Sequence, residues 1–144
     1  MTRPRTETKT SRVTFFQVTN DSMKRKWILQ IAQEYFEKKE PLLFKLPHKK
    51  ALEYLDLLLW RLPQDSFIPH IIKDTPSSDL IVLTSSDENP NGARSIFNLT
   101  GKPILNPFYR ALYTFEDLSS TEKNTVAQEH YHAYKALGHM IVSL

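Results

Sequence analysis

The chain has 144 residues, 40% of them hydrophobic and 11% aromatic, and it contains no cysteine. That composition is typical of one globular domain with a real core, and it excludes disulfides, thiolate metal sites and cysteine nucleophiles. The net charge of +3 comes from residues 1–12, where four basic residues stand against Glu7, so the neutral remainder is not expected to bind duplex DNA directly.

The first residues are polar and contain no apolar run, which is not the pattern of a secretory signal. No segment approaches the roughly 20 apolar residues that a membrane-spanning helix needs. Together with the absence of cysteine, these features predict a soluble, cytoplasmic protein in a reducing compartment. We expect residues 1–11 to form a basic, flexible tail and residues 12–144 to form a single domain.

Strand-like and helix-like segments alternate through the first half of the chain. The expected elements are strands at 12–18 and 42–46 and helices at 22–38 and about 48–60. Asp21 or Ser22 is expected to cap the first helix. Strands that alternate with helices favour right-handed parallel crossovers.

Shorter segments follow in the second half. The expected elements are an extended piece at 67–70, strands at 79–84, 95–99 and 111–116, and a helix at 120–137. The whole order predicts a three-layer α/β domain of Rossmann-like outline. Its sheet should be mostly parallel, with helices on both faces.

The last helix is expected to separate into two stripes at 3.6 residues per turn. The expected inward stripe is Val126, His130, Ala133 and Leu137, and the expected outward stripe is Asn124, Gln128, Tyr131 and Lys135, with His132 beside it. The outward stripe holds an aromatic ring, that of Tyr131, among polar and basic groups. It is therefore a candidate working surface.

No motif for a cofactor, a metal ion or catalysis is found. The turn after the first strand has no glycine, so neither a dinucleotide fingerprint nor a phosphate-binding loop exists there. His130 and His132 are two positions apart, roughly 200° around a helix, and cannot bind one ion from the same helix. We therefore predict no catalytic, cofactor-binding or metal-binding residues.

Apolar side chains gather at the end of the second helix and just after it. They are Leu57, Trp60, Pro63, Phe67 and Pro69. Tryptophan and phenylalanine commonly anchor protein interfaces because they offer large, rigid contact areas. Two interpretations stay open: these residues form an interface, or they cap the core.

Two segments carry a resemblance to a known family. Residues 59–70 (LWRLPQDSFIPH) resemble the LW…P…SF(V/I)PH segment of the chi subunit of bacterial DNA polymerase III holoenzyme. Residues 129–138 (EHYHAYKALG) are similar to that family's E-x-Y-x-A-Y-(K/R)-x-x-G ending. The order of elements agrees as well, so the resemblance covers nearly everything except the tail.

The resemblance implies a non-catalytic accessory subunit that acts in DNA replication within the cytoplasmic replisome. It implies a Rossmann-like domain without nucleotide, bound to the clamp loader through the psi subunit. It also implies that the subunit captures the acidic C-terminal tail of single-stranded-DNA-binding protein, which ends in phenylalanine.

The resemblance also implies two sets of site residues. Trp60, Pro63 and Phe67 would face psi, and Phe115, Lys123, Gln128, Tyr131, His132 and Lys135 would hold the tail. An acidic peptide with an aromatic end needs cations around an apolar notch. However, this chain has Asn124, Gln128 and His132 where the family often has arginine or lysine, which would weaken tail binding and make it depend on pH through His132.

Two alternatives remain open from the sequence. The chain could be a chi-like adaptor for a different protein partner. It could also be a small α/β enzyme without a recognisable motif, for which a deep pocket with His70, His130 and a carboxylate would be the sign.

Overall fold

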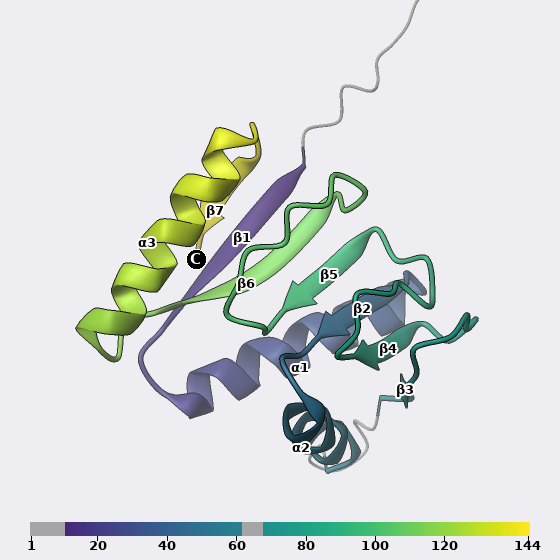
Figure 1. Cartoon of the computed structure of the whole chain (residues 1–144). Helices are drawn as coiled ribbons and strands as arrows, with labels where there is room; N and C mark the ends of the chain where they lie inside the picture. Colours follow the sequence, from purple (N-terminus) through teal and green to yellow (C-terminus); the bar gives the residue numbers. More distant parts are fainter. Residues whose placement is uncertain (1–10, 62–67) are drawn as a thin grey trace, which may run out of the picture.

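The structure is a computed structural model, and it describes residues 11–61 and 68–144. The elements in chain order are β1 (Arg12–Val18), α1 (Asp21–Lys38), β2 (Leu42–Lys45), α2 (Lys49–Trp60), β3 (Ile71–Ile72), β4 (Ile81–Thr84), β5 (Ser95–Asn98), β6 (Ala111–Asp117), α3 (Thr121–Ala136) and β7 (Met140–Ser143). Within this part of the chain the strands form one sheet in the order β3-β4-β2-β5-β6-β1-β7, and every pairing is parallel (Figure 1).

Helices cover both faces of the sheet, which confirms the predicted three-layer α/β fold. On one face α1 and α2 pack over Phe16 and Val18 of β1. On the other face α3 and the segment at 99–110 pack over Val13 and Phe15 of the same strand (Figure 1). Because side chains alternate along a strand, a continuous apolar run such as β1 supplies both cores, as expected for a buried parallel sheet.

The strand order changes direction between β1 and β6, which are neighbours in the sheet. From β1 the chain passes through α1 to β2. From β6 it passes through α3, which lies on the opposite face of the sheet, to β7. The N-terminal turns of α1 and α3 therefore lie at the same edge of the sheet. In open α/β sheets, that arrangement leaves a crevice where ligands commonly bind.

Each helix begins at a polar cap. The side chains of Asn20, His48 and Ser120 accept hydrogen bonds from backbone N–H groups three residues later. The cap of α1 is therefore Asn20 and not Asp21 or Ser22, since Asn20 has the extended backbone that a cap requires. α3 ends with Gly138 at a φ of 85°, and the His139 N–H donates to the Tyr134 carbonyl at 3.3 Å, a Schellman-type termination.

The rotation of α3 about its axis differs from the prediction. Its buried residues are Ala127, His130 and Tyr134, whereas Val126 and Leu137 are exposed. The predicted inward stripe was right at His130 and wrong at Val126 and Leu137, and Ala133 is half-buried. The fully buried Tyr134 ring packs edge-on against Phe15 at 6.2 Å, which turns this tyrosine toward the sheet.

Two short strands also differ from the prediction. β7 was not predicted, and its residues become a strand by pairing in parallel with β1. Of the extended piece expected at 67–70, Phe67 lies outside the described residues and residues 68–70 form no strand; a two-residue strand follows at Ile71–Ile72, paired with β4. The other predicted elements are present, with ends that differ by no more than two residues. No helix among the described residues is long and apolar enough to cross a membrane.

Candidate partner-binding site

Tyr134 fixes how α3 sits on the sheet. Its hydroxyl accepts a hydrogen bond from the Ile104 N–H at 2.9 Å and one from the Asn98 amide at 3.5 Å. Burial raises the pKa of Tyr134, although these two hydrogen bonds oppose the rise, so the hydroxyl stays neutral. With Tyr134 anchored, Tyr131 lies one turn earlier beside the sheet, packed against the second core.

A small pocket of about 200 Å³ lies between α3 and the strands β1, β6 and β7. Its lining is Phe15, Gln17, Glu116, Ala127, Gln128, Tyr131 and Ser143. Tyr131 is half-buried, with its ring 6.3 Å from that of Phe15. Drug-sized ligands occupy roughly 300–1,000 Å³, so this pocket suits a single side chain or a short peptide end.

The polar groups around this small pocket have mixed charge. Glu116 accepts a hydrogen bond from the Gln17 amide at 3.2 Å and places a carboxylate in the lining. Lys135 brings its ammonium group to 5.7 Å from the centre of the Tyr131 ring. His132 is exposed and packs edge-on against Tyr131 at 5.5 Å. One lysine therefore stands beside the aromatic ring, and one carboxylate faces it.

The structure brings together only some of the residues predicted for the tail. Gln128 and Tyr131 line the small pocket, with His132 and Lys135 beside Tyr131. Phe115 does not join them, because side-chain alternation along β6 directs it into the other core. There it packs at 5.4 Å from Phe97.

Lys123 also lies apart, 3.7 Å from Asp117. It lines a larger pocket together with Phe115. Five residues of the small pocket were not predicted: Ala127 on α3 and, from the strands, Phe15, Gln17, Glu116 and Ser143. The alternation of side chains along a strand could have indicated the strand residues, since Phe15 and Gln17 lie on the same face of β1. Finding them also required the pairing of Gln17 with Glu116.

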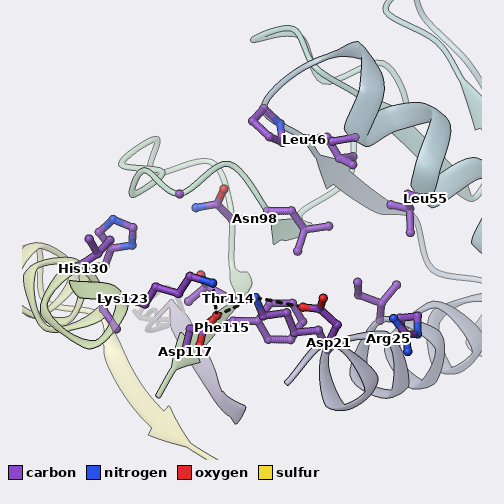
Figure 2. Close-up of a pocket in the computed structure, with 18 of the residues that line it drawn as sticks. Asp21, Arg25, Leu46, Leu55, Asn98, Thr114, Phe115, Asp117, Lys123 and His130 are labelled. Carbon is purple, nitrogen blue, oxygen red and sulfur yellow. Dashed lines mark ion pairs between the residues drawn. The ribbon is translucent and has the colours of Figure 1, made fainter. Parts of the chain in front are cut away.

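The larger pocket, of about 610 Å³, lies at the carboxyl edge of the sheet between the N-terminal turns of α1, α2 and α3. Figure 2 shows side chains from all three helices and from the strand ends around it. Leu46, Leu55 and Phe115 contribute apolar surface, and Asp117 lines the pocket with its ion pairs drawn as dashed lines.

Asp117 makes several polar contacts in this larger pocket. Its carboxylate lies 2.7 Å from the Lys24 ammonium, and it accepts hydrogen bonds from the N–H of Ser119 at 2.9 Å and the hydroxyl of Ser119 at 2.6 Å. Burial alone would raise the pKa of Asp117, but the bonds from Lys24 and Ser119 outweigh it and hold the pKa well below its usual range.

His70 and His130 do not lie together in the described part of the chain. His130 lines the larger pocket with Asp117, whereas His70 lies elsewhere, hydrogen-bonded to Asp56 at 2.8 Å. Burial lowers the pKa of His130, with a backbone hydrogen bond at Gly101 opposing it, so the ring is neutral at neutral pH. No cluster of three possible metal ligands occurs among residues 11–61 and 68–144.

A second surface follows α2. Tyr54, Leu57 and Trp60 are exposed large side chains on this helix, and Trp60 has 57% of its surface exposed. The indole of Trp60 packs edge-on against His70 at 5.6 Å. Pro63 and Phe67, which were predicted to share this surface, lie outside the described residues.

Comparison with known protein families matches residues 10–142 to the family described as DNA polymerase III chi subunit, HolC. The chain belongs to this chi family. The match covers every element described above except the last residue of β7, and it confirms the resemblance predicted from residues 59–70 and 129–138. No curated protein matches the chain significantly.

Membership of the chi family makes the chain an accessory subunit of DNA polymerase III and places it in DNA replication. The Rossmann-like fold therefore serves here in a polymerase assembly. Its two features that suit protein contacts are the small pocket at α3 and the apolar surface of α2.

Proposed function

We propose that this chi-family subunit is a non-catalytic adaptor that links the clamp loader, through a psi subunit, to the acidic C-terminal tail of single-stranded-DNA-binding protein. The observation that carries the proposal is the small pocket at α3. Four of the residues expected to hold the tail, Gln128, Tyr131, His132 and Lys135, line it or stand beside it.

The chemistry of that pocket supports an extended peptide with an aromatic end. Phe15 and Tyr131 offer apolar surface for an aromatic side chain. Lys135 offers a cation to the acidic residues of the tail. The Glu116 carboxylate would repel those acids, but it could accept a hydrogen bond from a backbone N–H of the peptide.

Phe115 and Lys123 are therefore less suited to the tail than the other predicted residues. Lys123 is engaged with Asp117, and Phe115 belongs to the other face of the sheet. We propose that the tail site centres on Tyr131 and that only one lysine, Lys135, serves it directly.

For psi we propose the α2 surface around Trp60. Three large exposed side chains on one helix are typical of a helix-docking surface, and Trp60 has the residue type and exposure of an interface anchor. Pro63 and Phe67 remain candidates for the same surface on the grounds of sequence alone.

Two binding measurements on one set of variants test both halves of this proposal. A peptide copying the C-terminus of the host's single-stranded-DNA-binding protein is titrated by calorimetry or fluorescence anisotropy at low salt, and psi is titrated separately. Replacing Tyr131 with alanine should weaken peptide binding by about 2 kcal/mol, roughly 30-fold in Kd, and leave the affinity for psi unchanged. Replacing Trp60 with alanine should weaken psi binding and leave the affinity for the peptide unchanged.

Each variant serves as the control for the other because both remove an aromatic ring from a helix surface. Tail binding that is indifferent to Tyr131→Ala would reject the site at α3. Psi binding that is indifferent to Trp60→Ala would reject the α2 surface. If the peptide binds but psi does not, the chain is an adaptor that serves a different partner on α2.

A further inference from the structure

The amino ends of three neighbouring strands each carry an arginine. Arg94 precedes β5, Arg110 precedes β6 and Arg12 begins β1. The Arg110 N–H donates to the Arg94 carbonyl at 2.7 Å, and the Arg12 N–H donates to the Arg110 carbonyl at 2.8 Å. Since neighbouring strands lie about 4.8 Å apart, the three backbones form a row roughly 10 Å long. We call these three residues the arginine row.

The arginine row lies at the edge of the sheet opposite the larger pocket. Figure 1 shows β1, β6 and β5 side by side, and because the sheet is parallel they begin at one edge and end at the other. The acids that precede strands at this edge, Glu40 and Asp79, belong to β2 and β4 in the other half of the sheet. The acids and the arginines that precede strands at this edge therefore lie in different halves of the sheet.

The three guanidinium groups are available to a ligand. All three residues are exposed, and within residues 11–61 and 68–144 none of them has a carboxylate oxygen within 4.0 Å. Glu34 and Arg12 both lie near Tyr113, and both affect its pKa. Burial is the largest cause that raises the pKa of Tyr113, Glu34 adds to the rise and Arg12 opposes it.

Glu34 does not neutralise Arg12, because its carboxylate is held by Lys38 at 3.3 Å. His139 precedes the next strand, β7, and burial lowers its pKa, with a backbone hydrogen bond at Ser11 opposing, so it adds no charge at neutral pH. At the amino ends of β5, β6 and β1 the positive charge therefore comes from the three arginines.

An exposed aromatic ring accompanies the arginines. Phe108 has 39% of its surface exposed, and the Arg94 guanidinium lies 4.5 Å from the centre of its ring. Leu105, three residues earlier, is also exposed. Aromatic rings and guanidinium planes both stack on unpaired nucleic-acid bases, which paired bases inside a duplex cannot offer.

The sequence before β1 contains further cations. Residues 1–10 are covalently joined to β1 through Ser11, and their sequence contains Arg3, Arg5 and Lys9 against Glu7.

We propose that the arginine row, together with Phe108, binds the phosphate backbone of single-stranded nucleic acid. Three cations on the folded domain are few for a duplex, whose affinity comes largely from phosphate contacts. Alternation along the strands places Arg94 and Arg110 on the α3 side, with the Phe108 ring beside Arg94, and turns Arg12 toward α1. A single strand that crosses this edge of the sheet can meet all three arginines with its phosphates and the ring with a base. Membership of a DNA polymerase III subunit family brings the chain close to such a ligand.

The test measures binding of a fluorescently labelled oligothymidylate by the full chain as salt is varied. Each phosphate contact contributes about −0.7 to the slope of log K against log salt for single strands. Three contacts give a slope of about −2, or a loss of roughly 100-fold in affinity for a tenfold rise in salt. The cations at 1–10 would make the slope steeper.

A charge-matched pair of variants isolates the arginine row. Arg12→Gln, Arg94→Gln and Arg110→Gln combined should flatten the slope by about 2 and lower affinity at low salt by roughly 100-fold or more. Lys26→Gln, Lys49→Gln and Lys50→Gln combined remove the same charge from exposed positions on α1 and α2 and should keep the slope. Arg110→Glu alone gives a second test in case the triple variant fails to fold.

Phe108→Ala separates stacking from charge. It should lower affinity at least about fivefold with an unchanged salt slope, since stacking is worth about 1–3 kcal/mol per base. The proposal is overturned if wild type does not bind the oligonucleotide at low salt, or if the two triple variants bind it equally. Tighter binding of a duplex, or of vesicles containing anionic lipid, at the same salt would overturn it as well. None of these outcomes depends on tail or psi binding.

Discussion

Asp117 ties the end of β6 to the first turns of α1 and α3, so its replacement by asparagine is a sharp test of what holds the larger pocket together. The side chain is only 13% exposed and lies 2.7 Å from the Lys24 ammonium. Asparagine is nearly isosteric and can still accept from Ser119, but it loses the charge and offers an N–H₂ group that Lys24 cannot use.

Hydrogen bonds to charged groups contribute about 1.5–3 kcal/mol, which sets the expected loss in the free energy of unfolding for Asp117→Asn at neutral pH. For a chain of this size, each kcal/mol corresponds to roughly 2–4 °C in Tm. Urea denaturation and a thermal melt followed by circular dichroism measure both quantities. The slope m in urea should not change, because the surface exposed on unfolding is the same.

Asp87→Asn is the matched control. Asp87 also pairs with a lysine at 2.8 Å, with Lys45, but its side chain is fully exposed and the pair is screened by water. Its stability effect should therefore be clearly smaller. Equal losses in the two variants would refute the claim that burial of Asp117 strengthens its ion pair.

The pH dependence provides a second check on Asp117. Its pKa is lower in the folded chain than the ordinary value near 3.9, so its stabilising contribution is complete above that ordinary value and is lost as pH falls through the folded pKa. The stability difference between wild type and Asp117→Asn should therefore shrink below about pH 4. A difference that stays constant down to acid unfolding would contradict this account.

Three further predictions concern single side chains. Tyr134→Phe leaves the Ile104 N–H without its acceptor and should lower the free energy of unfolding by about 1–3 kcal/mol, with faster hydrogen exchange at Ile104; unchanged exchange would contradict it. Gly138→Ala meets no atom within 4 Å but must adopt a φ of 85°, so it should cost about 1–2 kcal/mol in urea denaturation, and no loss would reject a conformational cost. Because burial lowers the pKa of His130, stability should fall as pH drops below about 6.5, by at most about 1.4 kcal/mol per pH unit, and His130→Gln should reduce that fall; parallel pH profiles for the two chains would refute it.

Local signals were sufficient for most of the elements. The apolar, β-branched run of β1 and the helical spacing of α1 each specify one kind of structure, because each side-chain period fits only one backbone geometry. Alternation of strands and helices then favoured a parallel sheet, which the structure confirms. The family resemblance followed from two segments of sequence alone.

Local signals were insufficient where a neighbour decides the outcome. The four residues of β7 are too few for a period to be read, and they form a strand because β1 offers an open edge. The inward stripe predicted for α3 left out Tyr134, whose hydroxyl is polar, yet the structure buries this side chain completely. Its buried hydroxyl is acceptable because the Ile104 N–H satisfies it.

The candidate sites show the same division. Sequence alone determined which residue types the chain has for binding partners: an aromatic and a lysine on the last helix, a tryptophan at the end of α2, and arginines scattered between distant segments. Tertiary structure decided which of them meet. It separated Phe115 from Tyr131 through the alternation of β6, added Phe15 to the pocket, and aligned three arginines. Strand order and register bring distant residues together, and no short stretch of sequence encodes either of them.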